Sequence, residues 1–452
     1  MTFSFLQVAL ICTLYLSILF GIAYTTEKGW VPNRIVSHPI IYIFSLGIFA
    51  SAWSFYGVID LAKEYGYGAL AYYLGTGALF LFAPIALKPL IELARRFQIN
   101  SMADLFTFRY HSHSVGGAVT LCMLLAMMPL LALQIQAVGD TIHILTRYNG
   151  SDLNAGALQF NSRAILAFIY CTVIACFAMM FGSNREHHKG LITAMAFESL
   201  VKLFGLFAIG VFSVFYVFGD LQGLDQWLLD NPENIKNLYS SAKNNSSHTL
   251  LLVFLSTAVS MPHIFHMTVV ENPVKHATRT VSWAFPLFLF FMALPVFPIL
   301  WAGIKLNSTV PAQYFPLIVP MASGNATFTV ISFVAGLSAA TGAIIAIALA
   351  VATMIMNHWI LPATPLRTKK EIYGQLIRIR RILIAVVVII GYLFYLSLNN
   401  RFSLTDLALT SFIATLQFLP GMIAVVHWSQ GNRWGLYSGL LAGFGIWICS
   451  LL

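Results

Sequence analysis

Long apolar runs alternate with short polar segments along almost the whole chain. A helix needs about 20 mostly apolar residues to span a bilayer, and about 12 runs reach this length. Each run is predicted to form one spanning helix: residues 3–24, 38–61, 69–91, 115–146, 163–182, 190–219, 249–270, 281–304, 326–356, 381–398, 403–427 and 434–452. The longest polar gap, 220–248, is expected to be an exposed loop. The pattern predicts an all-α polytopic membrane protein.

The composition excludes an ordinary soluble protein. The 452 residues are 59% hydrophobic and 9% charged, whereas about 25% of a soluble domain is charged. No soluble domain fits between the apolar runs, so residues 1–452 are expected to form one transmembrane domain. The first run is too long for the core of a signal peptide and is expected to be a retained helix.

Charge placement predicts the orientation in the membrane. The chain has 25 Lys and Arg against 16 Asp and Glu. Most of the basic residues lie in loops after odd-numbered spans, and basic loops favour the cytoplasmic side. The N-terminus is therefore expected outside. Because topology accounts for the basic excess, nucleic acid is not expected as a partner. Membrane lipids are expected as partners because the chain spans the membrane.

The run 253–272, VFLSTAVSMPHIFHMTVVEN, has polar residues in its middle. Pro262 lacks a backbone N–H and clashes one turn back, so the helix should kink or break there. Many secondary transporters build their binding sites at broken helices. The polar residues around this break are Ser256, Thr257, Ser260 and His263. A kinked helix that binds nothing is the alternative.

Two other spans contain ionisable residues, which are functional candidates inside a membrane. Gln136, Asp140 and His143 share one face of a helix. They are candidates for carrying a proton, unless they lie at the outer interface where water reaches them. Glu198 and Lys202 are four residues apart, so they are predicted to form an internal ion pair, with a proton or substrate relay as the alternative.

Neither metal, cofactor nor enzymatic chemistry is expected. His263 and His266 share a helix face, but no nearby carboxylate or thiolate completes a metal-binding set. The five cysteines fall in apolar runs and indicate no disulfide framework. The sequence also has no nucleophile–base set or phosphate-binding loop that would indicate an enzyme.

Four stretches resemble the sodium:solute symporter family, which includes proline permease and the sodium–glucose transporters. They occur in the family's order: NSMADLFTFRYHS (100–112), LALQIQAVGDTIHIL (131–145), SMPHIFHMTVVEN (260–272) and FLPGMIAVVHWSQGNRWGLYSGLLAG (418–443). The resemblance implies a LeuT-type inverted-repeat fold with 5+5 core helices. The first core repeat would be 38–219 and the second 249–427, with peripheral helices at 1–37 and 434–452.

The same resemblance implies a solute site between the first helices of the two repeats. The residues at this site carry hydroxyl, amide and aromatic groups, a mixture that suits a small polar solute. The residues that would bind the solute are Ser51, Trp53, Ser54, Tyr56, Gln134, Gln136, Ser256, Thr257 and Ser260.

The sodium site of the family is expected to be degenerate. The family uses carbonyls of the first core helix, here near Ala50, and adjacent hydroxyls of the eighth core helix. Gly342 and Ala343 occupy the hydroxyl positions, and Ala339 also lacks an oxygen ligand in its side chain. Sodium coupling is therefore expected to be lost. The candidate carriers for proton coupling are Asp140, His143, Glu198 and His263.

A closer resemblance is to the membrane domain of CbrA-type sensor histidine kinases. It is carried by TFSFLQVALICTLYLSILFGIAYTTEKGWVP (2–32), SLGIFASAWSFYG (45–57) and FPLFLFFMALPVFPIL (285–300). It implies the bacterial inner membrane and an amino acid ligand, with histidine first. No kinase region is present, so the chain is expected to be either a free-standing transporter or a fragment of a sensor. The two functional hypotheses are sodium-independent transport of a small solute and solute sensing for a histidine kinase.

Overall fold

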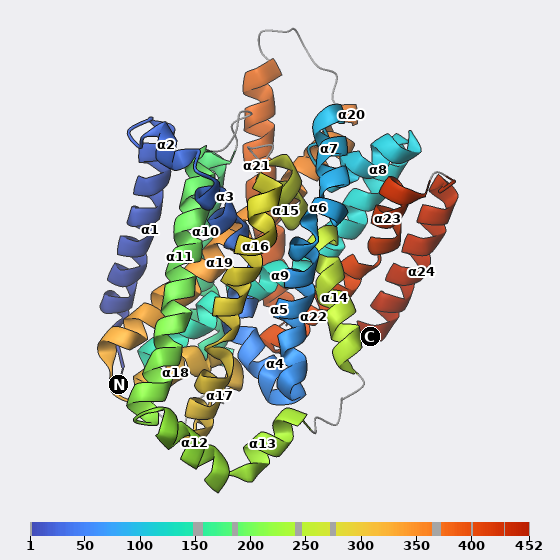
Figure 1. Ribbon diagram of the computed structural model, residues 1–452. Coiled ribbons are helices and arrows are strands. Elements are labelled where there is room, and N and C mark those ends of the chain that lie inside the picture. Colours follow the sequence, from blue (N-terminus) through green and yellow to red (C-terminus); the bar gives the residue numbers. More distant parts are fainter. Residues whose placement is uncertain are drawn as a thin grey trace.

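The computed structural model describes residues 2–147, 157–182, 189–239, 246–271, 277–363, 372–398, 401–428 and 430–451. These residues form helices joined by short connections, with no β-strand among them (Figure 1). The structure confirms an all-α polytopic membrane protein.

The helices up to residue 217 are as follows: α1 (Phe5–Glu27), α2 (Asn33–Val36), α3 (Pro39–Ser45), η1 (Leu46–Phe49), η2 (Trp53–Gly57), α4 (Val58–Tyr65), η3 (Gly66–Leu70), α5 (Ala71–Leu81), α6 (Ala83–Ala86), α7 (Lys88–Phe97), α8 (Met102–Tyr110), α9 (His113–Arg147), α10 (Ala157–Phe181), α11 (Lys189–Phe212) and η4 (Ser213–Val217). The remaining helices are these: α12 (Leu221–Asp230), α13 (Pro232–Tyr239), α14 (Ser246–Ser260), α15 (Pro262–Phe265), η5 (His266–Val270), α16 (Ala277–Ala293), α17 (Val296–Lys305), η6 (Ala312–Tyr314), α18 (Phe315–Ala322), α19 (Ala326–Ile355), η7 (Met356–Ile360), α20 (Leu361–Ala363), α21 (Ile372–Leu398), α22 (Leu404–Leu416), α23 (Leu419–His427) and α24 (Arg433–Leu451).

Each predicted span contains helix, but the number of spans depends on how broken helices are counted. In the described residues, 8 helices are long and apolar enough to cross a membrane, or up to 10 if each bent pair is one span. The predicted total of about 12 is reached only when α5, which belongs to the first bent pair, is counted as a span of its own and α24 is added. The predicted span 69–91 is not continuous, since α5, α6 and α7 follow one another with interruptions at Phe82 and Leu87. Pro84 and Pro89 lie at the starts of α6 and α7, where their missing N–H groups are tolerated.

Two spans are broken in the middle. The axis of Pro39–Phe49 is bent by 71° from the run that begins at Trp53, and Ser247–Ser260 is bent by 52° from Pro262–Val270. The second break lies directly before Pro262, as the sequence predicts. Each broken helix is the first of its predicted repeat.

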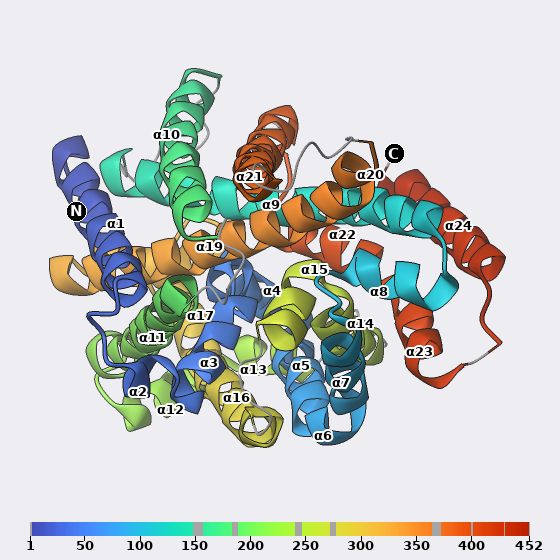
Figure 2. The ribbon, with the colours of Figure 1, turned by 90° about the horizontal axis from the view of Figure 1, so that it is seen from above.

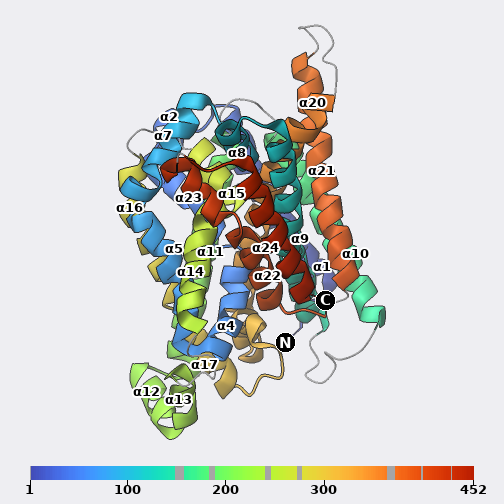
Figure 3. The ribbon, with the colours of Figure 1, turned by 90° about the vertical axis from the view of Figure 1, so that its right-hand side faces the viewer.

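The long helices α9 and α19 form the centre of the bundle (Figure 2). In the most apolar stretch of Ala326–Ala363, 94% of the residues are buried inside the protein. In the corresponding stretch of Phe5–Glu27, the share is 17%. Helix α11 packs against α19, α3 and α1, which places it between the centre and the first broken helix. Helices α1 and α24 lie on opposite sides of the bundle. The short helices α12 and α13 cover one end of it (Figure 3).

Candidate functional site

The first broken helix exposes backbone groups that nearby side chains satisfy. Without water, an unpartnered carbonyl or N–H inside a membrane costs several kcal/mol. Tyr72 donates to the Phe49 carbonyl at 3.2 Å, and Ser54 donates to the Ser51 carbonyl at 2.8 Å. The interruption is therefore a defined backbone conformation that these hydrogen bonds stabilise.

Lys202 donates hydrogen bonds to two further carbonyls at the end of this first half. Its Nζ atom donates to the carbonyl oxygens of Gly47 at 3.0 Å and Ala50 at 2.8 Å. Lys202 is 1% exposed, so its charge lies inside the protein. The Ala50 carbonyl, which the family resemblance assigns to a sodium site, thus accepts a hydrogen bond from an ammonium group.

The second half of the broken helix begins beside α9. The side-chain oxygen of Gln134 accepts a hydrogen bond from the Ala52 N–H at 2.9 Å, and the Ser51 hydroxyl accepts one from the Trp53 N–H at 3.3 Å. The side chain of Gln134 also donates to Leu130 of its own helix. The structure therefore places Gln134 at the helix break as a support for the backbone.

An aromatic cluster joins the two broken helices. The Trp53 ring lies 5.4 Å from that of Phe254 on α14, 4.8 Å from that of Tyr72 and 5.0 Å from that of Phe412. Trp53 is buried, and its indole N–H has no hydrogen-bond partner among the described residues. A buried polar atom of this kind is rare in a folded protein and is a candidate contact for a ligand.

At the second break, the three hydroxyl residues bond to their own helix. Ser256 donates to Val253, Thr257 to Phe254 and Ser260 to Ser256, each through a backbone carbonyl. Such bonds satisfy the hydroxyl donors and leave oxygen lone pairs for other donors. His263 is 3% exposed, and its Nδ1 atom is unpartnered in the part of the chain that the structure describes.

Gln136 and Asp140 belong to a second polar cluster, further along α9. Arg163 on α10 lies 3.2 Å from Asp140 and forms an ion pair with it, while the Tyr314 hydroxyl donates to the other carboxylate oxygen. Gln136 donates to the Phe402 carbonyl at 3.1 Å. Gln136, Asp140 and Tyr314 are buried inside the protein, whereas Arg163 is partly exposed. His143 is also buried.

Tyr56 connects the helix break with this second cluster. Its ring centroid lies 5.9 Å from that of Tyr314, and its hydroxyl has no partner within the described ranges. Gly336 on α19 makes room for Tyr56, because a Cβ atom there would lie 1.8 Å from the tyrosine oxygen. The predicted solute residues thus lie at the two helix breaks, except that Gln136 belongs to the Asp140 cluster and Tyr56 lies between the first break and that cluster.

Glu198 and Lys202 do not form the predicted ion pair by direct contact. Neither residue reaches the other within ion-pair distance in the described structure, because each has a different partner. Glu198 accepts a hydrogen bond from the Tyr15 hydroxyl of α1 at 2.8 Å, whereas Lys202 extends to the broken helix. The two charged side chains of this turn of α11 therefore contact two different helices, α1 and the first broken helix.

Glu198 faces Gly342, one of the positions that the family resemblance assigns to a sodium site. A Cβ atom on Gly342 would lie 2.7 Å from Glu198 Oε2. Ala339 and Ala343 are fully buried on the same helix. The nearby hydroxyls of Ser338 and Thr341 donate to the carbonyls of Ala335 and Leu337, and Thr341 also contacts the Tyr170 hydroxyl.

Several contributors to these clusters were not predicted. Arg163 stands at the very start of the predicted span 163–182, but α10 begins before it and brings it to Asp140. Tyr15 and Tyr314 lie in apolar surroundings, and nothing local distinguishes them from packing residues. A further pair lies at the other end of α19, where His358 Nε2 is 2.8 Å from Asp104 Oδ1 and Asn357 donates to the same carboxylate.

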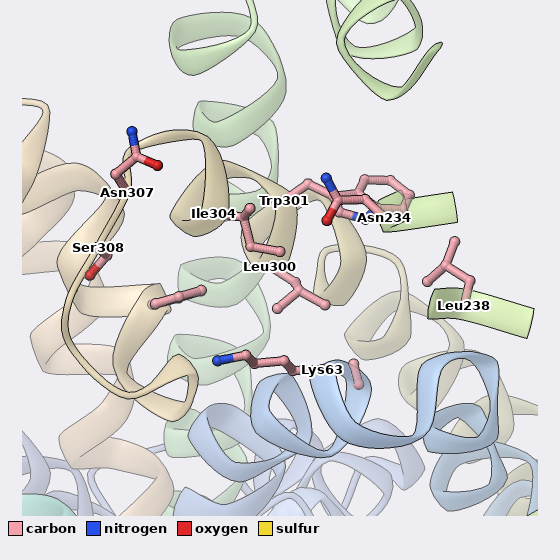
Figure 4. Close-up of a pocket in the computed structure, with 10 residues that line it drawn as sticks. Lys63, Asn234, Leu238, Leu300, Trp301, Ile304, Asn307 and Ser308 are labelled. Atoms are coloured by element: carbon pink, nitrogen blue, oxygen red, sulfur yellow. The ribbon is translucent and has the colours of Figure 1, made fainter. Parts of the chain in front are cut away.

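A cavity of about 470 Å³ lies apart from the candidate site (Figure 4). It is found between α4, α13, α17 and the loop that follows α17, at the end of the bundle covered by α12 and α13. Lys63, Asn234, Asn307 and Ser308 contribute its polar lining. None of the predicted solute residues lines it, so it is a surface feature separate from the helix breaks.

Comparison with known proteins supports a transporter. The chain is 22% identical over 430 residues to an uncharacterized symporter, YhjB, of Bacillus subtilis, with 93% of this chain and 82% of that protein covered. It is 21% identical over 437 residues to a monocarboxylic acid transporter of Corynebacterium glutamicum, with 88% and 74% covered. No family model matches the chain.

A solved structure has the same architecture. The substrate-bound, outward-open state of a Na⁺-coupled sialic acid symporter superposes with a TM-score of 0.69 at 13% identity, covering 97% of this chain and 92% of that chain. The chain has the fold of a solute symporter. The LeuT-type inverted-repeat architecture predicted from the sequence is thereby confirmed, and the two broken helices are its most informative feature.

Proposed function

We propose that this protein transports a small organic solute across the membrane by alternating access, without coupling to sodium. The proposal is carried by one observation: buried polar atoms of Trp53, Tyr56 and His263 have no partner in the described structure, and they lie at or beside two broken helices. Broken helices in such folds hold substrates where the repeats meet. Residues 38–219 and 249–427 are the repeats that would move against each other.

The proposed solute carries a carboxylate. The helix that starts at Trp53 has the positive end of its dipole at the break, which favours an anionic group. The name of one relative gives monocarboxylic acids as its solutes. An amino acid also carries a carboxylate, and histidine is the first amino acid to test. The site proposed for it comprises Ser51, Trp53, Ser54, Tyr56, Gln134, Gln136, Ser256, Thr257 and Ser260.

The proposed sodium independence rests on the residues that correspond to the family's sodium site, which are Ala50, Gly342 and Ala343. Hard cations such as sodium prefer several oxygen ligands, but Gly342 and Ala343 supply none from their side chains. Asp140, His143, Glu198 and His263 remain the candidate proton carriers. The alternative function, solute sensing for a histidine kinase, is not favoured, because both relatives bear the names of transport proteins.

Uptake into proteoliposomes tests the proposal. Radiolabelled histidine and radiolabelled lactate are each offered under a pH gradient alone and under a sodium gradient alone. We expect one of them to accumulate under the pH gradient, with no effect of sodium. Accumulation driven by sodium would contradict the coupling, and failure of both solutes under both gradients would contradict the solute class.

A pair of tryptophan variants tests the site. Trp53→Ala removes the ring that joins the broken helices, so uptake should fall at least about tenfold. Trp283→Ala is the matched control, because Trp283 is 60% exposed on α16 and faces away from the protein interior. Equal loss of uptake in the two variants would contradict the placement of the site.

A further inference from the structure

We propose that the ammonium group of Lys202 is a built-in cation, which permanently occupies the position at the first helix break where a transported cation would otherwise bind. The inference rests on the proposed function for its meaning in transport. Its test measures cation binding and stability without transport, so the two proposals can fail separately.

The backbone at the break is a cation site by its chemistry. The half-helix formed by α3 and η1 ends at Phe49, and its last carbonyls carry the negative end of the helix dipole. Carbonyls at such an unwound end coordinate cations in transporters. Two of them, from Gly47 and Ala50, accept hydrogen bonds from Lys202 Nζ at 3.0 and 2.8 Å.

The chain has the shape needed to bring a lysine to this position. Ser199 lies one turn before Lys202 on α11, and a Cβ atom on Gly47 would lie 2.5 Å from its hydroxyl oxygen. A glycine at position 47 therefore permits α11 to approach the broken helix closely. From this distance the lysine reaches the carbonyls, although it is 1% exposed.

The negative charge of the region also comes from α11. Glu198 Oε2 lies where a side chain at position 342 of α19 would be, because a Cβ atom there would lie 2.7 Å from this oxygen. Helix α19 thus has no side-chain ligand at Gly342, and α11 provides both a cation and a carboxylate. Their opposite charges offset each other within the membrane, where a single charge would be costly.

Thermal unfolding in detergent tests the proposal. The midpoint temperature, Tm, is measured in sodium, potassium or choline chloride at equal ionic strength. The wild-type protein should show the same Tm in all three salts, because its cation site is filled. Lys202→Ala should lower Tm by about 5 °C, since the two carbonyls lose their donor.

Chemical rescue distinguishes a cation from a packing role. The alanine variant lacks the last three methylene groups and the ammonium, which n-propylammonium chloride can replace. We expect propylammonium or sodium, but not choline, to recover at least half of the lost Tm. Lys202→Met fills the space without a charge, so its lowered Tm should respond to none of these cations. Lys189→Ala, on the exposed start of the same helix, is the matched control and should match the wild type.

Three outcomes would overturn the proposal. The first is a sodium-specific rise in the Tm of the wild-type protein, which decides the question even where a variant does not fold. The second is a Lys202→Met variant as stable as the wild type. The third is a folded Lys202→Ala variant whose Tm neither propylammonium nor sodium raises.

Discussion

Gln134 on α9 accepts a hydrogen bond from the backbone N–H of Ala52 at 2.9 Å. The bond crosses from the central helix to the start of the second half of the first broken helix, and Gln134 is fully buried. Ala52 N–H is one of the donors that a helix leaves unsatisfied at its start. A side chain from a neighbouring helix therefore does the work of an N-cap and fixes the direction in which the second half leaves the break.

Replacing this glutamine should destabilise the protein. Gln134→Leu removes the acceptor and leaves a buried N–H unpartnered, which costs about 1–3 kcal/mol. The resulting fall in Tm is measured by thermal unfolding in detergent. Gln226→Leu, on the exposed helix α12, provides the same change without a buried partner and should leave Tm unchanged. A Gln134→Leu protein as stable as its control would show that the break is held by other contacts.

Adding one methyl group to Gly336 should displace Tyr56. A Cβ atom there would lie 1.8 Å from the tyrosine oxygen, so Gly336→Ala overpacks the core and should cost about 1–3 kcal/mol. Alanine otherwise favours a helix by about 1 kcal/mol over glycine. Gly439→Ala on α24, where nothing lies within 4 Å of the added atom, should therefore be neutral or stabilising. Unfolding midpoints that move in the same direction would refute the contact.

The ion pair between Asp140 and Arg163 should show strong coupling in a double-mutant cycle. Asp140→Ala leaves a largely buried guanidinium unpaired, so we expect a loss of about 3–5 kcal/mol in the free energy of unfolding. Arg163→Ala should cost a similar amount. The double variant should be less damaged than the sum of the two, because neither charge then remains alone. Additive losses would mean that the two residues do not stabilise each other.

Asp104 connects α8 to the end of α19, so its removal should loosen that connection. Asp104→Ala deprives His358 and Asn357 of their shared partner. Amide hydrogen exchange in α8 should become about tenfold faster, which corresponds to a loss of about 1.4 kcal/mol. Asp225→Ala on exposed α12 is the control and should leave exchange in α8 unaltered. Unchanged exchange in α8 of the Asp104 variant would contradict this role.

The architecture could be predicted because its causes are local. Apolar length decides where a span lies, and Pro262 decides where one of them breaks. The first break was harder to predict, since it contains no proline. The sequence SLGIFASAWSFYG gives way at Ala50 and Ser51 because tertiary partners, including Tyr72 and Gln134, satisfy the opened backbone.

Partners within the site could be predicted only in part. The spacing of Glu198 and Lys202 favours a pair with each other. Spacing within one helix, however, gives no information on the neighbouring helices that supply the actual partners. The actual partners of Lys202 are backbone carbonyls, which every residue carries, so no letter of the sequence marks them. Arg163 illustrates a different limit, because its contact with Asp140 depends on where α10 begins.

An ammonium group fixed to α11 has an energetic consequence for each turnover. A free ion that crosses a membrane gains or loses about 2.3 kcal/mol per 100 mV, and this energy can drive a solute uphill. A charge that belongs to the polypeptide returns with it at the end of every cycle, so the membrane voltage performs no net work on it. At the Lys202 position the cycle is therefore electrically silent, and any current recorded during uptake must come from the solute or from a proton.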